Sequence, residues 1–118
     1  MCSSDLAVEG TYYSTHYSPE NKSPAVTGFV ERFRKRWNNE VPDAMAALGY
    51  DAAMVLADAI KRAGTTESAK LRDAIAATKK LPSVTGDTTL DAQRNASKAA
   101  VVIAVRNGEF KFVEAVAP

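Results

Sequence analysis

The sequence predicts an α/β fold built from three helices, several short strands and a C-terminal β-hairpin. Apolar residues recur at helical spacing in three separate segments, which indicates three helices that each bury one face. Near the end of the chain, the dipeptide Asn107-Gly108 separates two runs rich in β-branched and aromatic residues. Asn-Gly between such runs is a strong hairpin signal, because a tight two-residue turn needs positive φ at both positions.

A strand is expected first, from Val8 to Thr15, because its threonine and tyrosine residues favour extended backbone. A polar loop over residues 18–22 separates this strand from the first helix. Ser23 and Pro24 mark the beginning of that helix, since serine caps helix N-termini and proline suits the first helical position. The helix carries one apolar stripe and is expected to end at Asn38-Asn39. The stripe consists of Val26, Phe29, Val30, Phe33 and Trp37.

The second helix is predicted to begin at Pro42-Asp43, with Asp43 or a neighbour as its cap. It is expected to end at Gly64, because glycine suits the left-handed residue that closes a helix. Asp51 and Asp58 are interpreted as charges on the helix surface. Alanine dominates the expected inner positions, so this helix can approach a neighbour closely. These positions are Met45, Leu48, Ala52, Val55, Leu56, Ala59, Ile60 and Ala63.

A third helix is expected to begin at residues 65–67 and to end before Pro82. Its inward positions are Leu71, Ala74, Ile75 and Thr78. Three strands follow, over residues 88–90, 99–105 and 109–116. Residues 101–105 are apolar throughout, which predicts a strand buried on both faces. Three apolar helix faces exceed what so little sheet can cover, so we expect a partner for this chain, in cis or in trans.

Composition narrows the possible functions. The chain has 118 residues, enough for one ordinary domain, and a net charge of +1, which argues against a nucleic-acid-binding surface. No apolar run approaches the roughly 20 residues that span a bilayer. Met1–Leu6 has neither the basic nor the apolar region of a secretion signal, and we interpret residues 1–7 as a non-native or disordered start. Cys2, the only cysteine, is expected to be a free thiol.

Several short motifs, taken in order, carry a resemblance to a known family. They are Val8-Glu9-Gly10, Gly49-Tyr50-Asp51-Ala52, Leu71-Arg72-Asp73-Ala74-Ile75, Val84-Thr85-Gly86 followed by Leu90-Asp91, and finally Asn107-Gly108. Their order and spacing resemble the C-terminal portion of leucine/isoleucine/valine-type (branched-chain amino acid) ABC transporter substrate-binding proteins. These proteins belong to the type I periplasmic binding protein family. The resemblance extends over nearly the whole chain, from Val8 to Pro118.

The resemblance implies part of a type I periplasmic binding fold, in which two Rossmann-like lobes are joined by three crossovers. Residues 8–97 would hold a crossover strand and the first-lobe helical segment, and residues 98–118 a crossover and the second-lobe hairpin. Crossovers are expected near residues 11–15 and 98–100. The N-terminal two thirds of such a protein, and its signal peptide, are absent from this chain.

The implied function is delivery of branched-chain or related amino acids to an ABC permease in the membrane by closure of an extracytoplasmic (periplasmic) cleft, with no catalysis and no cofactor. The alternative is a ligand-sensing domain of the same fold that acts in a receptor or regulator. The basic residues 32–36 are interpreted as a solvated helix face, with contact to the membrane transporter as the second interpretation.

Four candidate ligand-binding residues follow from the resemblance. By motif, Met45 falls where the family contacts the ligand side chain, and methionine adapts its shape to an apolar group. Tyr50 is the next candidate on the cleft side. Tyr13 and His16 lie near a crossover and are candidates for the rim. The alternatives stay open: core or rim positions for Met45 and Tyr50, and an exposed loop for His16. No catalytic or metal-ligating set is present in the sequence, which has a single histidine.

Overall fold

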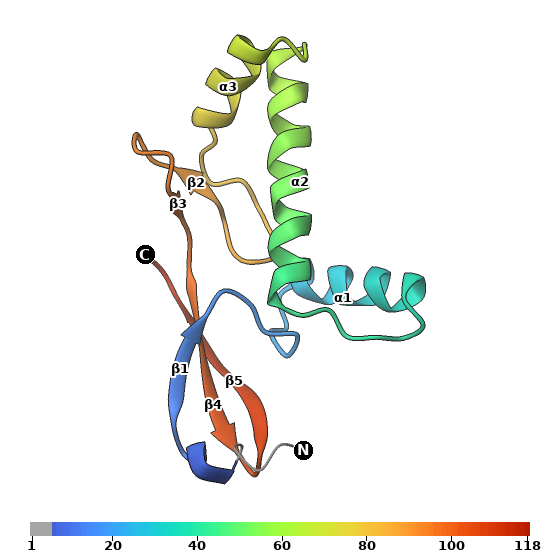
Figure 1. Ribbon diagram of the computed structural model, residues 1–118, viewed down its shortest axis with the longest axis vertical. Coiled ribbons are helices and arrows are strands. Elements are labelled where there is room, and N and C mark those ends of the chain that lie inside the picture. The colour runs from blue at the N-terminus through green and yellow to red at the C-terminus, as the bar shows by residue number, and fades with distance from the viewer. Residues whose placement is uncertain (1–5) are drawn as a thin grey trace.

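Three helices occupy one end of the molecule and a three-stranded sheet the other (Figure 1). The computed structural model describes residues 6–118. The helices are α1 (Pro24–Arg36), α2 (Ala44–Ala63) and α3 (Ser68–Ala76). The main sheet contains β1 (Tyr12–Thr15), β4 (Ala100–Arg106) and β5 (Glu109–Val116), and a separate two-stranded sheet contains β2 (Thr89–Leu90) and β3 (Ala96–Ser97).

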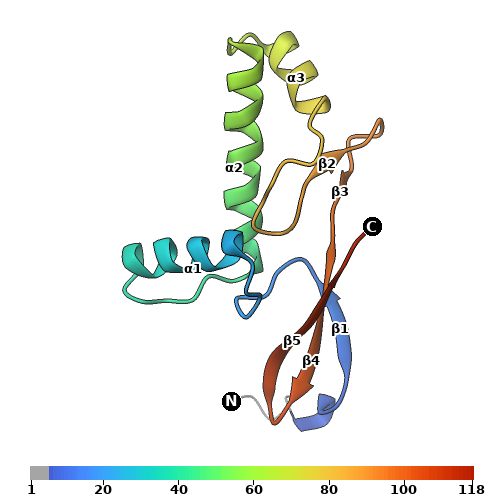
Figure 2. The same ribbon diagram turned by 180° about the vertical axis from the view of Figure 1, so that it is seen from behind.

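The molecule is elongated, with α2 as its long axis and α3 folded back beside it (Figures 1 and 2). Its dimensions are 51 × 33 × 23 Å, and its radius of gyration is 16.6 Å. A compact domain of this length has a radius of gyration of about 13 Å. The elements therefore do not close around a single core, in agreement with the excess of apolar helix faces noted in the sequence.

The expected strand from Val8 begins later in the structure. Leu6–Val8 form a short 3-10 helix, and β1 starts only at Tyr12. Gly10 causes the delay because its φ of 81° interrupts extended backbone, and the Thr11 hydroxyl donates to the Val8 carbonyl oxygen at 2.6 Å. The expected non-native or disordered start covers residues 1–7. Residues 1–5, which include Cys2 and its expected free thiol, lie outside the described residues.

The predicted helix ends are confirmed where a local cap defines them. The Ser23 hydroxyl accepts a hydrogen bond from the Val26 backbone N–H, and the Asp43 carboxylate accepts one from Ala46 N–H at 2.8 Å. Gly64 closes α2 with a φ of 65°. In α3, by contrast, the cap position Glu67 makes no side-chain hydrogen bond.

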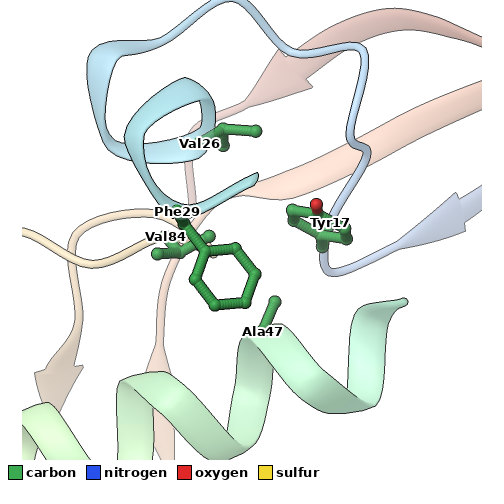
Figure 3. Close-up of a cluster of buried hydrophobic side chains, with 5 residues drawn as sticks. All are labelled: Tyr17, Val26, Phe29, Ala47 and Val84. Carbon is green, nitrogen blue, oxygen red and sulfur yellow. The ribbon is translucent and has the colours of Figure 1, made fainter. Parts of the chain in front are cut away.

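The main hydrophobic core lies where α1 crosses the first turns of α2 (Figure 3). It contains Tyr17, Val26, Phe29, Ala47 and Val84. Val26 and Phe29 confirm the inward stripe of α1. Trp37, the last member of that stripe, is 52% exposed because the end of α1 extends beyond α2 (Figure 1).

Several predicted inner positions of α2 are not covered. Met45 is 75% exposed, and Leu56 is 44% exposed. The buried residues of this helix are instead Ala47, Asp51 and Ala59. The helical period identified an apolar side correctly, but no described segment packs against much of that side.

Asp51 corrects the sequence interpretation most clearly, because it is buried (4% exposed) rather than a surface charge. Its carboxylate accepts hydrogen bonds from the backbone N–H groups of Val84 and Thr85, both at 2.8 Å. It also accepts one from the Thr85 hydroxyl at 2.7 Å. A buried charge is tolerated only when its hydrogen-bonding capacity is used in this way. Asp51 therefore anchors the turn at residues 84–86 to α2.

The main sheet has the order β1-β4-β5, with both pairs antiparallel. The hairpin prediction is confirmed, because Asn107 and Gly108 both have positive φ values, 54° and 70°. Four of residues 101–105 are buried, on both faces of the strand, while Val102 is only half-buried. No pattern in the sequence predicts β3, which has two residues and is held by one short pairing with β2.

We expect Asp51→Ala to lower the free energy of unfolding of the chain by about 3 kcal/mol, because three donors then lose a charged acceptor. Asp58→Ala on the same helix is the matched control. Asp58 forms an exposed pair with Arg62 at 2.7 Å, and such pairs contribute less than about 1 kcal/mol. Urea unfolding followed by circular dichroism measures both. Equal losses in the two variants would contradict the anchoring role of Asp51.

Candidate functional site

A cleft of about 620 Å³ lies between the main sheet and the segment that leads into α2. It collects residues from β1, from the loop after β1, from the first turn of α2 and from the hairpin. The lining residues are Tyr13, Thr15, Tyr17, Ser18, Pro19, Glu20, Val41, Pro42, Asp43, Ala44, Ile103, Gly108, Glu109 and Phe110. A cleft of this size suits a small ligand.

The chain passes twice between the sheet and the helices, once after β1 and once before β4 (Figures 1 and 2). The second passage is held by the turn that Asp51 anchors. Lys98 Nζ donates to Thr85 Oγ1 at 2.7 Å, and Ala99 packs against Gly86. A side chain at Gly86 would lie 3.4 Å from the Ala99 Cβ, and its φ of 101° also favours glycine. This passage therefore has a defined position relative to α2.

The sheet side of the cleft is largely apolar. Tyr13 on β1 packs edge-to-face against Phe110 on β5, with ring centroids 5.8 Å apart. Ile103 on β4 lies directly opposite Tyr13 in the β1–β4 pair. Edge-to-face aromatic pairs have a preferred geometry, so this wall is defined in shape as well as in polarity.

Two acidic residues of the cleft, Glu20 and Glu109, pair with Lys111 of β5. Glu20 accepts hydrogen bonds from Phe112 N–H at 2.8 Å and from Lys111 Nζ at 3.5 Å. The Phe112 N–H, and then the Lys111 charge, lower the pKa of Glu20 below its usual value. Glu109 binds Lys111 Nζ at 2.6 Å and is the main cause of the raised pKa of Lys111. Glu20 therefore connects the loop after β1 to the edge strand β5.

Tyr17 lies between the cleft and the hydrophobic core and was not singled out by sequence reasoning. It is 5% exposed, and its ring packs edge-to-face on Phe29 (Figure 3). Its hydroxyl has no hydrogen-bond partner among the described residues. Burial, together with the charge of Asp43, raises the pKa of Tyr17 to about 12, so the hydroxyl remains a donor at neutral pH. No periodic pattern or motif marks this loop residue in the sequence.

The four predicted site residues do not all meet in this cleft. Tyr13 lines it. His16 is exposed and lines two smaller neighbouring cavities, of about 220 and 250 Å³. Met45 is exposed next to Ala44, which does line the cleft. Tyr50 packs on Phe29 at 5.0 Å and accepts a hydrogen bond from Arg32 Nη2, so it lies at the rim of the core. The ligand-binding roles of these residues stay predictions.

Residues 3–109 match the family described as "Periplasmic binding protein", and the chain belongs to this family. No curated protein sequence matches the chain. Its fold is part of the type I periplasmic binding fold, as the resemblance in the sequence implied. Proteins of this family bind solutes and are in general not catalytic. None of the helices over residues 6–118 is long and apolar enough to cross a membrane.

Three solved structures illustrate the relationship. A leucine-binding protein from Thermotoga maritima is 39% identical, with a TM-score of 0.81 over 95% of this chain and 32% of its own. A putative branched-chain amino acid ABC transporter from Rhodospirillum rubrum is 35% identical, with a TM-score of 0.79, and the match covers 91% of this chain and 31% of the transporter chain. The LivJ substrate-binding protein from Streptococcus pneumoniae, solved with isoleucine, is 33% identical, with a TM-score of 0.77. The match covers 91% of this chain and 30% of the LivJ chain. The chain thus spans about a third of the length of these relatives.

We expect the contact between Glu20 and β5 to weaken in acid. A carboxyl group whose pKa is lowered by folding contributes stability that is present above its unfolded value, near 4.5, and is lost as the pH falls through the folded pKa. The backbone amide proton of Phe112, followed by NMR, is expected to titrate with a midpoint below 4.5. The change should disappear in Glu20→Gln. A midpoint at or above 4.5 would contradict this contact.

We expect Tyr17→Phe to raise the free energy of unfolding by about 1 kcal/mol, because it removes a buried hydroxyl without a partner and keeps the ring that packs on Phe29. Tyr50→Phe is the control, since its hydroxyl is hydrogen-bonded to Arg32 and its removal should not stabilise the chain. Urea unfolding of both variants measures the difference. Destabilisation by Tyr17→Phe would mean that its hydroxyl has a partner in solution.

Proposed function

We propose that this chain is part of an extracytoplasmic solute-binding protein that delivers branched-chain or related amino acids to an ABC importer, without catalysing a reaction. The observation that carries the proposal is the cleft of about 620 Å³ between two parts of the molecule that the chain connects twice. This arrangement allows the two parts to move relative to each other while remaining attached. A protein that must release what it binds needs that freedom.

The proposed mechanism is closure of the cleft on its ligand. A ligand that touches both walls interacts better with the closed arrangement than with the open one, and this difference in affinity shifts the population toward the closed state. The permease in the membrane then recognises the closed form. In this proposal the crossings lie near residues 11–15 and 98–100. The helical segment belongs to the first lobe and the C-terminal hairpin to the second.

The chemistry of the wall supports an apolar ligand side chain. Tyr13, Ile103 and Phe110 present apolar surface, whereas Glu20 and Glu109 are already engaged with Lys111. We propose that Met45 contacts the ligand side chain, because it lies exposed at the beginning of α2, adjacent to the cleft. His16 is proposed for the rim. Tyr50 takes a supporting position, since it packs on the core beneath the start of α2.

The remainder of a longer chain is the proposed partner for the uncovered side of α2. Leu56 is 44% exposed there, and a groove of about 370 Å³ runs along this side. The groove is lined mainly by Leu48, Ala52, Val55, Leu56, Ile75 and Leu90, and Lys98 also lines it. Apolar surface of this extent favours burial. The relatives are about three times as long as this chain, which supplies a segment of the required size.

We expect the isolated chain not to bind leucine, isoleucine or valine with micromolar affinity, because it supplies only part of the cleft. Co-expression with the part of the Thermotoga maritima leucine-binding protein that the chain does not match should restore assembly and binding. Gel filtration measures assembly, and isothermal titration calorimetry measures ligand affinity. Micromolar binding of leucine by the isolated chain would contradict the proposal.

Two variants on α2 separate the roles within this assembly. Met45→Ala should weaken leucine binding about tenfold at unchanged assembly, since it removes apolar contact with the ligand. Leu56→Ala should weaken assembly instead, since Leu56 lines the groove on the uncovered side of α2. Unchanged affinity in Met45→Ala would remove that residue from the proposed site without affecting the proposed function.

A further inference from the structure

The far end of α1 forms a projecting basic tip, which we define as Arg34, Lys35, Arg36 and Trp37. Figures 1 and 2 show α1 extending sideways from the base of α2, with its C-terminal end directed away from the rest of the molecule. All four residues of the basic tip are exposed. The tip is therefore convex and accessible, the opposite of a ligand cleft.

The positive charge of the basic tip is not neutralised by the described part of the chain. The salt bridges over residues 6–118 involve basic residues of α2, α3 and β5 but none of α1. Glu31 and Glu40 lie nearby in the sequence without pairing with the tip. The whole chain has a net charge of only +1, so this cluster of three charges is a local feature.

Stabilisation of the helix end explains only part of this arrangement. Basic residues in the last turn interact favourably with the helix dipole, which accounts for the charges. It does not account for Trp37, the only tryptophan of the chain, whose ring packs on Phe33 at the end of the apolar stripe yet stays 52% exposed. The Arg36 guanidinium lies 5.8 Å from the centre of the Trp37 ring, so a cation and an aromatic surface are presented together.

We propose that the basic tip adsorbs the protein onto an anionic lipid bilayer surface. Arginine and lysine side chains bind lipid phosphates, and tryptophan favours the headgroup region because its ring is apolar and its N–H is polar. A projecting tip can reach a flat surface without a change in fold. Each basic residue near such a surface contributes about fivefold in affinity. This inference goes beyond the proposed function, since it needs neither the ligand nor the cleft.

Trp37 provides a direct test with the 118-residue chain, because its fluorescence reports the environment of the tip alone. We expect a blue shift and co-sedimentation with phosphatidylcholine vesicles that contain phosphatidylglycerol, and neither with pure phosphatidylcholine vesicles. Both effects should weaken as salt is raised. The variant R34Q/K35Q/R36Q should lose about a hundredfold in affinity. The variant K61Q/K79Q/K80Q, which removes the same charge outside α1, should lose less than fivefold.

Each other outcome contradicts the proposal. Absence of binding to anionic vesicles would overturn it, as would equal losses in the two triple variants. Binding without a blue shift would exclude insertion of Trp37. Binding to neutral vesicles alone would point to general hydrophobic adsorption through the uncovered side of α2. Circular dichroism of the variants confirms that each is folded before binding is compared. None of these results alters the test of amino-acid binding, which depends on assembly.

Discussion

The arrangement of the molecule depends on the buried carboxylate of Asp51. Its three hydrogen bonds are all made to one turn, at residues 84–86. The same turn accepts a hydrogen bond from Lys98 and packs against Ala99. The direction in which the chain enters β4 is thus defined relative to α2. A carboxylate in a buried position is costly unless all of its donors are present, so partial formation of this turn is unfavourable. The contact consequently favours one position of the helices relative to the start of the sheet.

Local signals in the sequence predicted element boundaries correctly where a cap or a tight turn defines them, whereas α3 ends at Ala76, before the end expected near Pro82. Ser23, Asp43, Gly64 and Asn107-Gly108 all act within a few residues of their own position, through capping or through positive φ. Such effects are encoded in short segments and can be recognised there. Gly10 acts in the same local way, and its positive φ explains why the strand predicted from Val8 begins only at Tyr12.

The residues that define the site could not be identified in the same way. Asp51 receives its hydrogen bonds from residues 33 and 34 positions later, and Glu20 reaches β5 across 92 positions. Neither spacing leaves a periodic trace in the sequence. In α2, the apolar period extends to Met45 and Leu56, but periodicity cannot say what covers them. The resemblance to a family was needed to connect that uncovered surface with a longer protein.

The two uncovered regions of the molecule have different physical requirements. The exposed side of α2 is lined mainly by aliphatic side chains, for which contact with water is unfavourable, so lasting burial of this side would stabilise the chain. The cleft combines the aromatic wall of Tyr13 and Phe110 with Glu20 and Glu109, whose charges both pair with Lys111. Paired surface charges remain favourable in water, so the cleft tolerates being filled and emptied. A surface that water can wet reversibly suits a site that is filled and emptied, whereas the aliphatic side of α2 suits a lasting contact.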